Sequence, residues 1–195
     1  TQVTNSTDVE IGAKFSGGGR GIVTSLSQGS VSNIVEMDLK GRILRKLTNG
    51  GSLDVSPSLS PDGSQVVFCS DRGGGPQIYL MNIDGSNPHR VSFTGSSYCT
   101  SPAWSPKGDK IAFVCRGGGF QIYITSPQGG AAVQLTFAGN NEDPSWSPDG
   151  RFLVFSSTSG GSRNLTVLSL LGGSPTRVSY TKSEDSQPAW SPSEP

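Results

Sequence analysis

The sequence predicts an all-β fold made of repeated four-stranded antiparallel sheets, and three observations support this. A Ser-Pro phrase recurs with its serines at 60, 105, 147 and 191, after a weaker copy at Ser16. The steps of 44, 45, 42 and 44 residues between these five serines are typical of a repeat whose unit is one supersecondary motif. The 27 Gly and 13 Pro residues separate β-branched and aromatic segments, as turn residues do. No segment has a convincing helical apolar period.

The first half of each repeat predicts two strands joined by a tight turn. The first strand ends in a large apolar residue: Phe15, Leu59, Trp104, Trp146 or Trp190. The turn is clearest at Ser60-Pro-Asp-Gly63, where Pro presets φ, Asp bonds its own backbone and Gly allows a positive φ. Short apolar runs follow and indicate buried second strands at 21–24, 65–68, 110–113 and 152–155.

The second half of each repeat predicts two further strands. Gly-rich stretches at 72–75, 116–119 and 159–161 lead to third strands at 33–35, 77–79, 121–123 and 164–166. After another glycine turn, the fourth strands carry a Leu-Thr or Val-Ser signature at 46–48, 90–92, 134–136 and 177–179. Each unit therefore reads as a four-stranded meander, which is the blade of a β-propeller.

The repeats divide the chain into four blades and a fifth first strand. We expect the blades at 10–48, 54–93, 99–137 and 141–179, with a closing strand at 187–192. A polar segment, 1–9, precedes them and a short tail, 193–195, follows. Because five first strands accompany only four sets of the others, we favour a larger ring over four closed blades.

The composition argues against several classes of function. Fifteen basic and fifteen acidic residues cancel without any run of like charge, so a nucleic-acid-binding arm is not expected. A membrane-spanning helix needs about 20 consecutive apolar residues, and no stretch of the sequence is close to that length. The single histidine, His89, precedes a fourth strand and suits neither a catalytic triad nor a His-rich metal centre. We therefore predict no enzymatic activity and no tightly bound cofactor.

The three cysteines, Cys69, Cys99 and Cys115, contain no Cys-x-x-Cys pair. They are either small buried thiols or one disulfide with a thiol left over. Their spacing does not decide between these alternatives.

Acidic residues gather in the connections from each fourth strand to the next first strand. In a propeller of meander blades, these connections lie on the same face as the loops between the second and third strands. On that face they surround the mouth of the central channel of the propeller. Seven of the fifteen acids lie there: Asp8, Glu10, Asp54, Glu142, Asp143, Glu184 and Asp185. Such a rim would attract a basic segment or a weakly bound Ca²⁺. Arg72 and Arg116 in the neighbouring loops would neutralise part of it.

The repeated phrase, the Gln-Ile-Tyr third strands and the final Pro188-Ala-Trp-Ser-Pro192 resemble the PD40 group of propellers, and within it the TolB family of the Tol–Pal envelope system. This resemblance implies a six-bladed ring, a periplasmic location, and binding of a Pal-type lipoprotein and other Tol proteins at the channel mouth. The candidate partner-binding residues are then Asp8, Val9, Glu10, Gly12, Asp54, Val55, Ser56, Asn141, Glu142, Asp143, Glu184 and Asp185.

An alternative stays open because other propellers have similar blades. The chain also resembles the gating propeller of prolyl-oligopeptidase-like serine peptidases, in which a hydrolase domain carries the nucleophile. A Gly-x-Ser-x-Gly domain in the same protein would favour that alternative.

Overall fold

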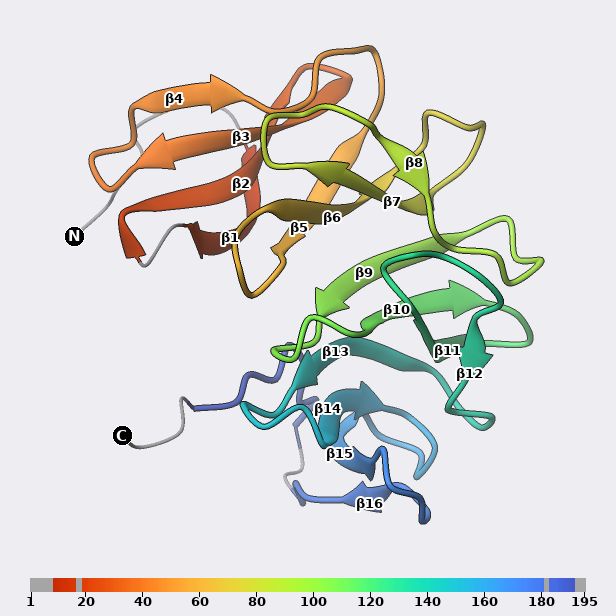
Figure 1. Ribbon diagram of the computed structural model, residues 1–195. Helices are drawn as coiled ribbons and strands as arrows, with labels where there is room; N and C mark the ends of the chain where they lie inside the picture. The colour runs from red at the N-terminus through yellow and green to blue at the C-terminus, as the bar shows by residue number, and fades with distance from the viewer. Residues whose placement is uncertain (1–8, 17–18, 181–182, 192–195) are drawn as a thin grey trace.

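The computed structural model describes residues 9–16, 19–180 and 183–191 and confirms the all-β class. Within those ranges sixteen strands form four separate sheets, and there is no α-helix. Each sheet holds four antiparallel strands in sequence order, so each is a meander. The sheets follow one another along an arc, with the first strand of each on the inner side and the fourth on the outer side (Figure 1).

Each sheet is one blade, and the strands have the following bounds. The first blade contains β1 (Val9–Ser16), β2 (Gly21–Gln28), β3 (Val31–Asp38) and β4 (Ile43–Lys46). The second contains β5 (Asp54–Leu59), β6 (Gln65–Ser70), β7 (Gln77–Asn82) and β8 (His89–Arg90). The third contains β9 (Cys99–Trp104), β10 (Ile111–Arg116), β11 (Phe120–Thr125) and β12 (Val133–Gln134). The fourth contains β13 (Asn141–Trp146), β14 (Phe152–Ser157), β15 (Asn164–Ser169) and β16 (Thr176–Arg177).

The Ser-Pro phrase forms the turn between the first and second strands. In the second blade the N–H of Gly63 donates to the carbonyl of Ser60 over 2.9 Å, and Gly63 has a φ of 72°. The Ser60 hydroxyl donates to Asp62 over 2.6 Å, and the Ser147 hydroxyl donates to Asp149 over the same distance. Each element of the phrase therefore has a local role in the turn.

The Leu-Thr or Val-Ser signature also has a structural explanation. The Thr or Ser hydroxyl accepts a hydrogen bond from a backbone N–H of the third strand in every blade. These pairs are Thr48 with Ile34 (2.9 Å), Ser92 with Ile78 (3.0 Å), Thr136 with Ile122 (2.9 Å) and Ser179 with Leu165 (2.8 Å). The hydroxyl thus continues the ladder beyond the short fourth strand.

The core lies between consecutive blades. The second strands are buried on both faces, because successive side chains of a strand point to opposite sides. Val66 and Phe68 of β6 pack toward the first blade, whereas Val67 and Cys69 pack toward the third. Burial of a side chain such as Phe68 contributes about 1.5–3 kcal/mol. This packing holds the first strands side by side.

The segment after the fourth blade differs in part from the sequence prediction. The closing strand was expected at 187–192, of which 192 lies outside the described residues. Residues 187–191 form no strand, and no strand in the described part of the chain pairs with them. Trp190 nevertheless makes the same contact as Trp146, since its indole N–H donates to the carbonyl of Ser145 over 3.1 Å as that of Trp146 donates to the carbonyl of Ala103 over 2.9 Å.

The cysteines follow the second alternative. Cys99 and Cys115 form a disulfide between directly opposed residues of β9 and β10. Cys69 keeps a free buried thiol, and burial raises the pKa of that thiol to about 11.

Candidate binding surface

The first strands of the four blades line one open groove with a volume of about 790 Å³. Residues 187–189 complete its wall. The repeat gives much of the groove a regular lining, because the same positions recur from the second blade on: Pro57, Pro102, Pro144 and Pro188, together with Trp104 and Trp146. The groove is therefore formed by the first strands and the starts of the Ser-Pro turns that follow them.

One residue of each of the four first strands, and Gln187 after the fourth blade, lies in the left-handed region of backbone conformation, and each lines the groove. We call these five the bulge residues: Gly12 (φ 72°), Ser56 (54°), Ser101 (51°), Asp143 (55°) and Gln187 (51°). In the four paired first strands the register with the second strand shifts at this point. A β-bulge of this kind bends a strand and re-aims its side chains.

The conformation of the bulge residues is energetically unfavourable. Four of them carry a side chain, and all four precede a proline, a position that normally favours extended backbone. A non-glycine residue at positive φ costs about 1–3 kcal/mol and persists where the surrounding structure determines it. This unfavourable conformation recurs along one groove, and the groove is therefore the candidate functional surface.

Asp54, a candidate from the sequence, is buried instead of facing the groove. It is 1 % exposed, and Nη2 of Arg72 lies 3.1 Å from each of its carboxylate oxygens. Arg72 Nε donates to Ser70 over 2.9 Å, and its guanidinium lies 5.0 and 5.1 Å from the ring centres of Phe68 and Tyr79. The charge of Asp54 is therefore compensated within the blade.

The fourth blade places its candidates differently. Asn141 is buried, and its Nδ2 donates to Gln121 Oε1 over 3.0 Å and to the carbonyl of Ala138 over 2.9 Å. Glu142 pairs with Arg163 over 2.7 Å. The expected rim of uncompensated carboxylates is thus not found at Asp54 or Glu142. The two pairs do place second-to-third loops beside the starts of first strands, as a meander requires.

The other candidates lie in several different environments. Asp185 accepts a 2.6 Å hydrogen bond from Ser179, and its N–H donates to the carbonyl of Arg163 over 3.1 Å. Glu184 is exposed, while Val55 is partly buried against the core between the second and third blades. Val9 and Glu10 lie in β1, and Asp8 lies outside the described residues. Gly12, Ser56 and Asp143 are bulge residues of the groove.

One position of the repeat relates several of these residues. From the second blade on, the position six residues before the phrase serine is occupied by Asp54, Cys99, Asn141 and Asp185. Each is fastened in its own way, by an ion pair, a disulfide, an amide network or a hydroxyl. These residues anchor the start of the first strand, and the bulge residue follows two positions later.

Gln187 was not among the candidates from the sequence, and the resemblance to TolB propellers indicated Ser101 only as a weaker candidate. The signal that could have found them is their place immediately before the proline that opens each phrase.

The structure offers no preformed metal site in the ranges that it describes, where no group of three or more His, Cys, Asp or Glu side chains could hold an ion. Weak calcium binding therefore stays a prediction. His89 is exposed, with its Nδ1 2.9 Å from the carbonyl of Asn87. Within the same described ranges, no helix has the length and apolar character of a membrane span.

The blades and the groove along their first strands define this chain as a β-propeller with a candidate binding surface on its inner side. The family model of the PD40 repeat, described as the TolB beta propeller domain, matches residues 1–194. The chain belongs to this family.

Individual relatives agree with this assignment. The chain is 36 % identical over 152 residues to the Tol-Pal system protein TolB of Bordetella pertussis, an alignment that covers 78 % of this chain and 35 % of that protein. It therefore spans about a third of the length of that relative. The crystal structure of TolB from Acinetobacter baumannii (30 % identity, TM-score 0.82, 93 % of this chain and 46 % of that one) shares its fold. So does the structure of a putative TolB from Agrobacterium tumefaciens (25 % identity, TM-score 0.85, 97 % of this chain and 69 % of that one).

Proposed function

We propose that this chain is a non-enzymatic, protein-binding propeller of the Tol–Pal system that binds a Pal-type lipoprotein at the mouth of its groove. The observation that carries the proposal is the row of bulge residues, which line the groove in a conformation that costs stability. The name shared by the relatives, Tol-Pal system protein TolB, supplies the class of partner.

The chemistry of the groove favours binding over catalysis. Its bulge side chains are two serines, a glutamine and one carboxylate, and prolines and tryptophans form much of the remaining wall. Such a surface can hydrogen-bond an extended segment and pack against its apolar side chains. Asp143 would attract a basic group of the partner.

The disulfide supports a periplasmic location. Disulfides form and persist in oxidising compartments such as the bacterial periplasm and are rare in the cytosol. The Cys99–Cys115 bond is therefore compatible with the compartment in which an envelope-integrity system works. Contacts with other Tol proteins are part of the same proposal.

The proposal is tested by titrating the chain with the periplasmic domain of Pal from the same cell, at several salt concentrations. We expect wild-type binding, weakened about tenfold (about 1.4 kcal/mol) by Asp143→Asn, because charge-assisted hydrogen bonds contribute about 1.5–3 kcal/mol. Asp84→Asn, at the outer turn between β7 and β8, is the matched control and should bind like wild type. Absence of wild-type binding at every salt concentration would contradict the proposal.

A further inference from the structure

We propose that the Cys99–Cys115 disulfide holds the part of the third blade beside the groove in the conformation that binds a partner. It would hold the loop 93–98, which we call the third mouth loop, and the bulge residue Ser101. The binding part of this inference rests on the proposed function, whereas the positioning part can be measured without a partner.

The disulfide lies where the groove begins. Cys99 is the first residue of β9 and Cys115 is its directly opposed partner on β10. Both are 0 % exposed. Ser101 follows two residues after Cys99 with a φ of 51° and lines the groove. The bond therefore fixes the start of β9 two residues before its bulge residue, Ser101.

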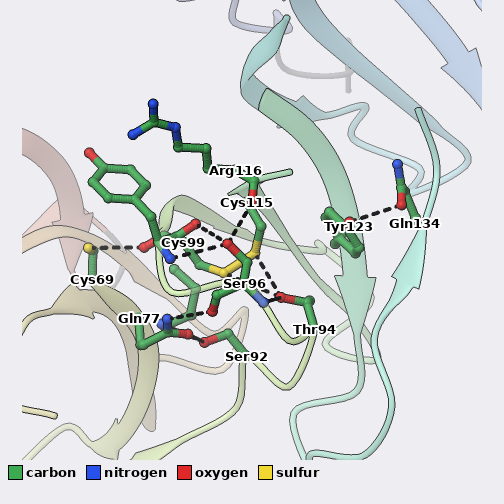
Figure 2. The surroundings of a disulfide bond; sticks show 12 residues. Cys69, Gln77, Ser92, Thr94, Ser96, Cys99, Cys115, Arg116, Tyr123 and Gln134 are labelled. Carbon is green, nitrogen blue, oxygen red and sulfur yellow. Dashed lines mark hydrogen bonds between the residues drawn. A yellow bond between two sulfur atoms is a disulfide. The ribbon is translucent and has the colours of Figure 1, made fainter. Parts of the chain in front are cut away.

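The third mouth loop rests on this bond, as Figure 2 shows. The Thr94 hydroxyl lies 3.4 Å from Cys115 Sγ and 3.7 Å from Cys99 Sγ. It also accepts a hydrogen bond from the N–H of Ser96 over 3.2 Å. One side of the loop is thus packed on the two sulfur atoms.

The other side of the loop is fastened to neighbouring strands. Ser96 Oγ lies 2.7 Å from the carbonyl of Arg116, the residue that follows Cys115. The carbonyl of Ser96 accepts a 3.0 Å bond from Gln77 Nε2, and Gln77 Oε1 accepts a 2.7 Å bond from Ser92. Loss of the disulfide would leave the loop held only by these bonds to β7 and β10, and would remove the covalent link between the start of β9 and β10.

The equivalent positions of other blades use anchors that form without oxidation. Asp54 pairs with Arg72 in the second blade, and Asn141 bonds to Gln121 and Ala138 in the fourth. Gln77 occupies the place of Gln121, since each accepts a bond from the fourth-strand hydroxyl, Ser92 or Thr136. The second blade, next to the third, therefore contains the acceptor that an asparagine anchor at position 99 would need.

The burial of both sulfur atoms argues for a permanent anchor. Thiol–disulfide exchange needs access of an attacking thiolate to sulfur, and neither cysteine is exposed. The neighbouring thiol of Cys69, whose pKa burial raises to about 11, donates to the carbonyl of Cys99 over 3.4 Å.

The test compares the wild-type chain with Cys99→Ser/Cys115→Ser and Cys99→Asn/Cys115→Ser. Hydrogen exchange is measured first, without partner. We expect amides of 93–101 to exchange about tenfold faster or more in the double-serine variant, because local opening sets the rate, while β15 of the fourth blade is unchanged. The asparagine variant copies Asn141 and Ser157 of the fourth blade and should restore slow exchange.

Binding of the Pal domain is measured next. We expect the double-serine variant to bind about threefold or more weakly and the asparagine variant to recover, since a preorganised loop lowers the cost of association. Unchanged exchange at 93–101 in the double-serine variant would overturn the inference, as would faster exchange with unaltered Pal binding. A wild-type chain that fails to bind Pal contradicts the proposed function alone, because exchange is measured without partner.

Discussion

Arg72 holds the carboxylate of Asp54 with its Nη2 atom 3.1 Å from both oxygens, at the start of the first strand of the second blade. The side chain of Asp54 is 2 % exposed and that of Arg72 is 26 % exposed. An acid that the sequence suggested for the binding rim is therefore part of the blade's own structure. The ion pair fixes the start of β5 two residues before the bulge at Ser56.

Removal of Arg72 should consequently destabilise the protein strongly. Arg72→Ala leaves the buried carboxylate of Asp54 without its partner, and breaking a buried pair in this way costs about 3–5 kcal/mol; we expect the lower end because Arg72 is partly exposed. Unfolding in urea measures the effect. Arg42→Ala is the matched control, since Arg42 pairs with Asp38 but is 74 % exposed, and should cost less than about 1 kcal/mol. Equal urea midpoints for the two variants would show that Asp54 needs no partner.

Two tryptophans of the repeated phrase allow a matched comparison of one hydrogen bond. Trp104 and Trp146 are equally buried, at 8 % exposure. The indole N–H of Trp146 donates to Ala103 over 2.9 Å, whereas that of Trp104 has no partner in the described part of the chain. Both lose similar ring area when replaced by phenylalanine.

We expect Trp146→Phe to cost about 1 kcal/mol more than Trp104→Phe, because only the first substitution removes a hydrogen bond and the second removes an unsatisfied buried donor. The free energies of unfolding of the two variants, measured in the same denaturant, decide this. A larger loss at Trp104 would mean that its N–H does find a partner in solution.

Much of the fold could be predicted because its determinants are local. Ser60, Asp62 and Gly63 make the turn with their own backbone and side chains, and Thr48 or Ser92 continues the ladder fourteen residues away in the same blade. Hydrogen bonds within one blade recur wherever the sequence of the blade repeats. The period therefore predicted the four-stranded meander that the structure contains.

The candidate site was less predictable because its determinants are contacts between particular side chains that differ from blade to blade and do not recur with the repeat. The pair of Glu142 with Arg163 depends on which loops meet, and three cysteines alone do not specify the bond between Cys99 and Cys115. The bulge residues were hidden for another reason. Local preference before a proline is extended, and the ladder of each blade overrides it at Ser56, Ser101 and Asp143.

Asp62 should make stability depend on pH. A hydrogen bond from the Ser60 hydroxyl, with further bonds from Ser64, lowers the pKa of Asp62 to about 2, below the about 3.9 of an unfolded chain. The bonded carboxylate thus stabilises the fold fully above about pH 4, and this contribution is lost as pH falls from about 4 to about 2.

The difference in unfolding free energy between wild type and Asp62→Asn should therefore be constant near neutral pH and shrink across that acidic range. Ser60→Ala should reduce the same pH dependence, because it removes the largest cause of the lowered pKa. A wild-type–variant difference that stays constant down to pH 2 would rule out the role of this turn in acid stability.

The cost of the bulge conformation can be measured at Ser101. A β-branched residue at positive φ is a steric outlier, while glycine adopts that region freely. Ser101→Val should therefore be less stable than Ser101→Gly by about 1–3 kcal/mol, a difference visible in urea unfolding. Ser145→Val and Ser145→Gly provide the control, because Ser145 lies in regular register opposite Val154 of the fourth blade and the order should be reversed there, with valine favoured in a strand. If valine were also the more stable choice at Ser101, the left-handed conformation would not be imposed on that residue, and the groove would lose its distinguishing feature.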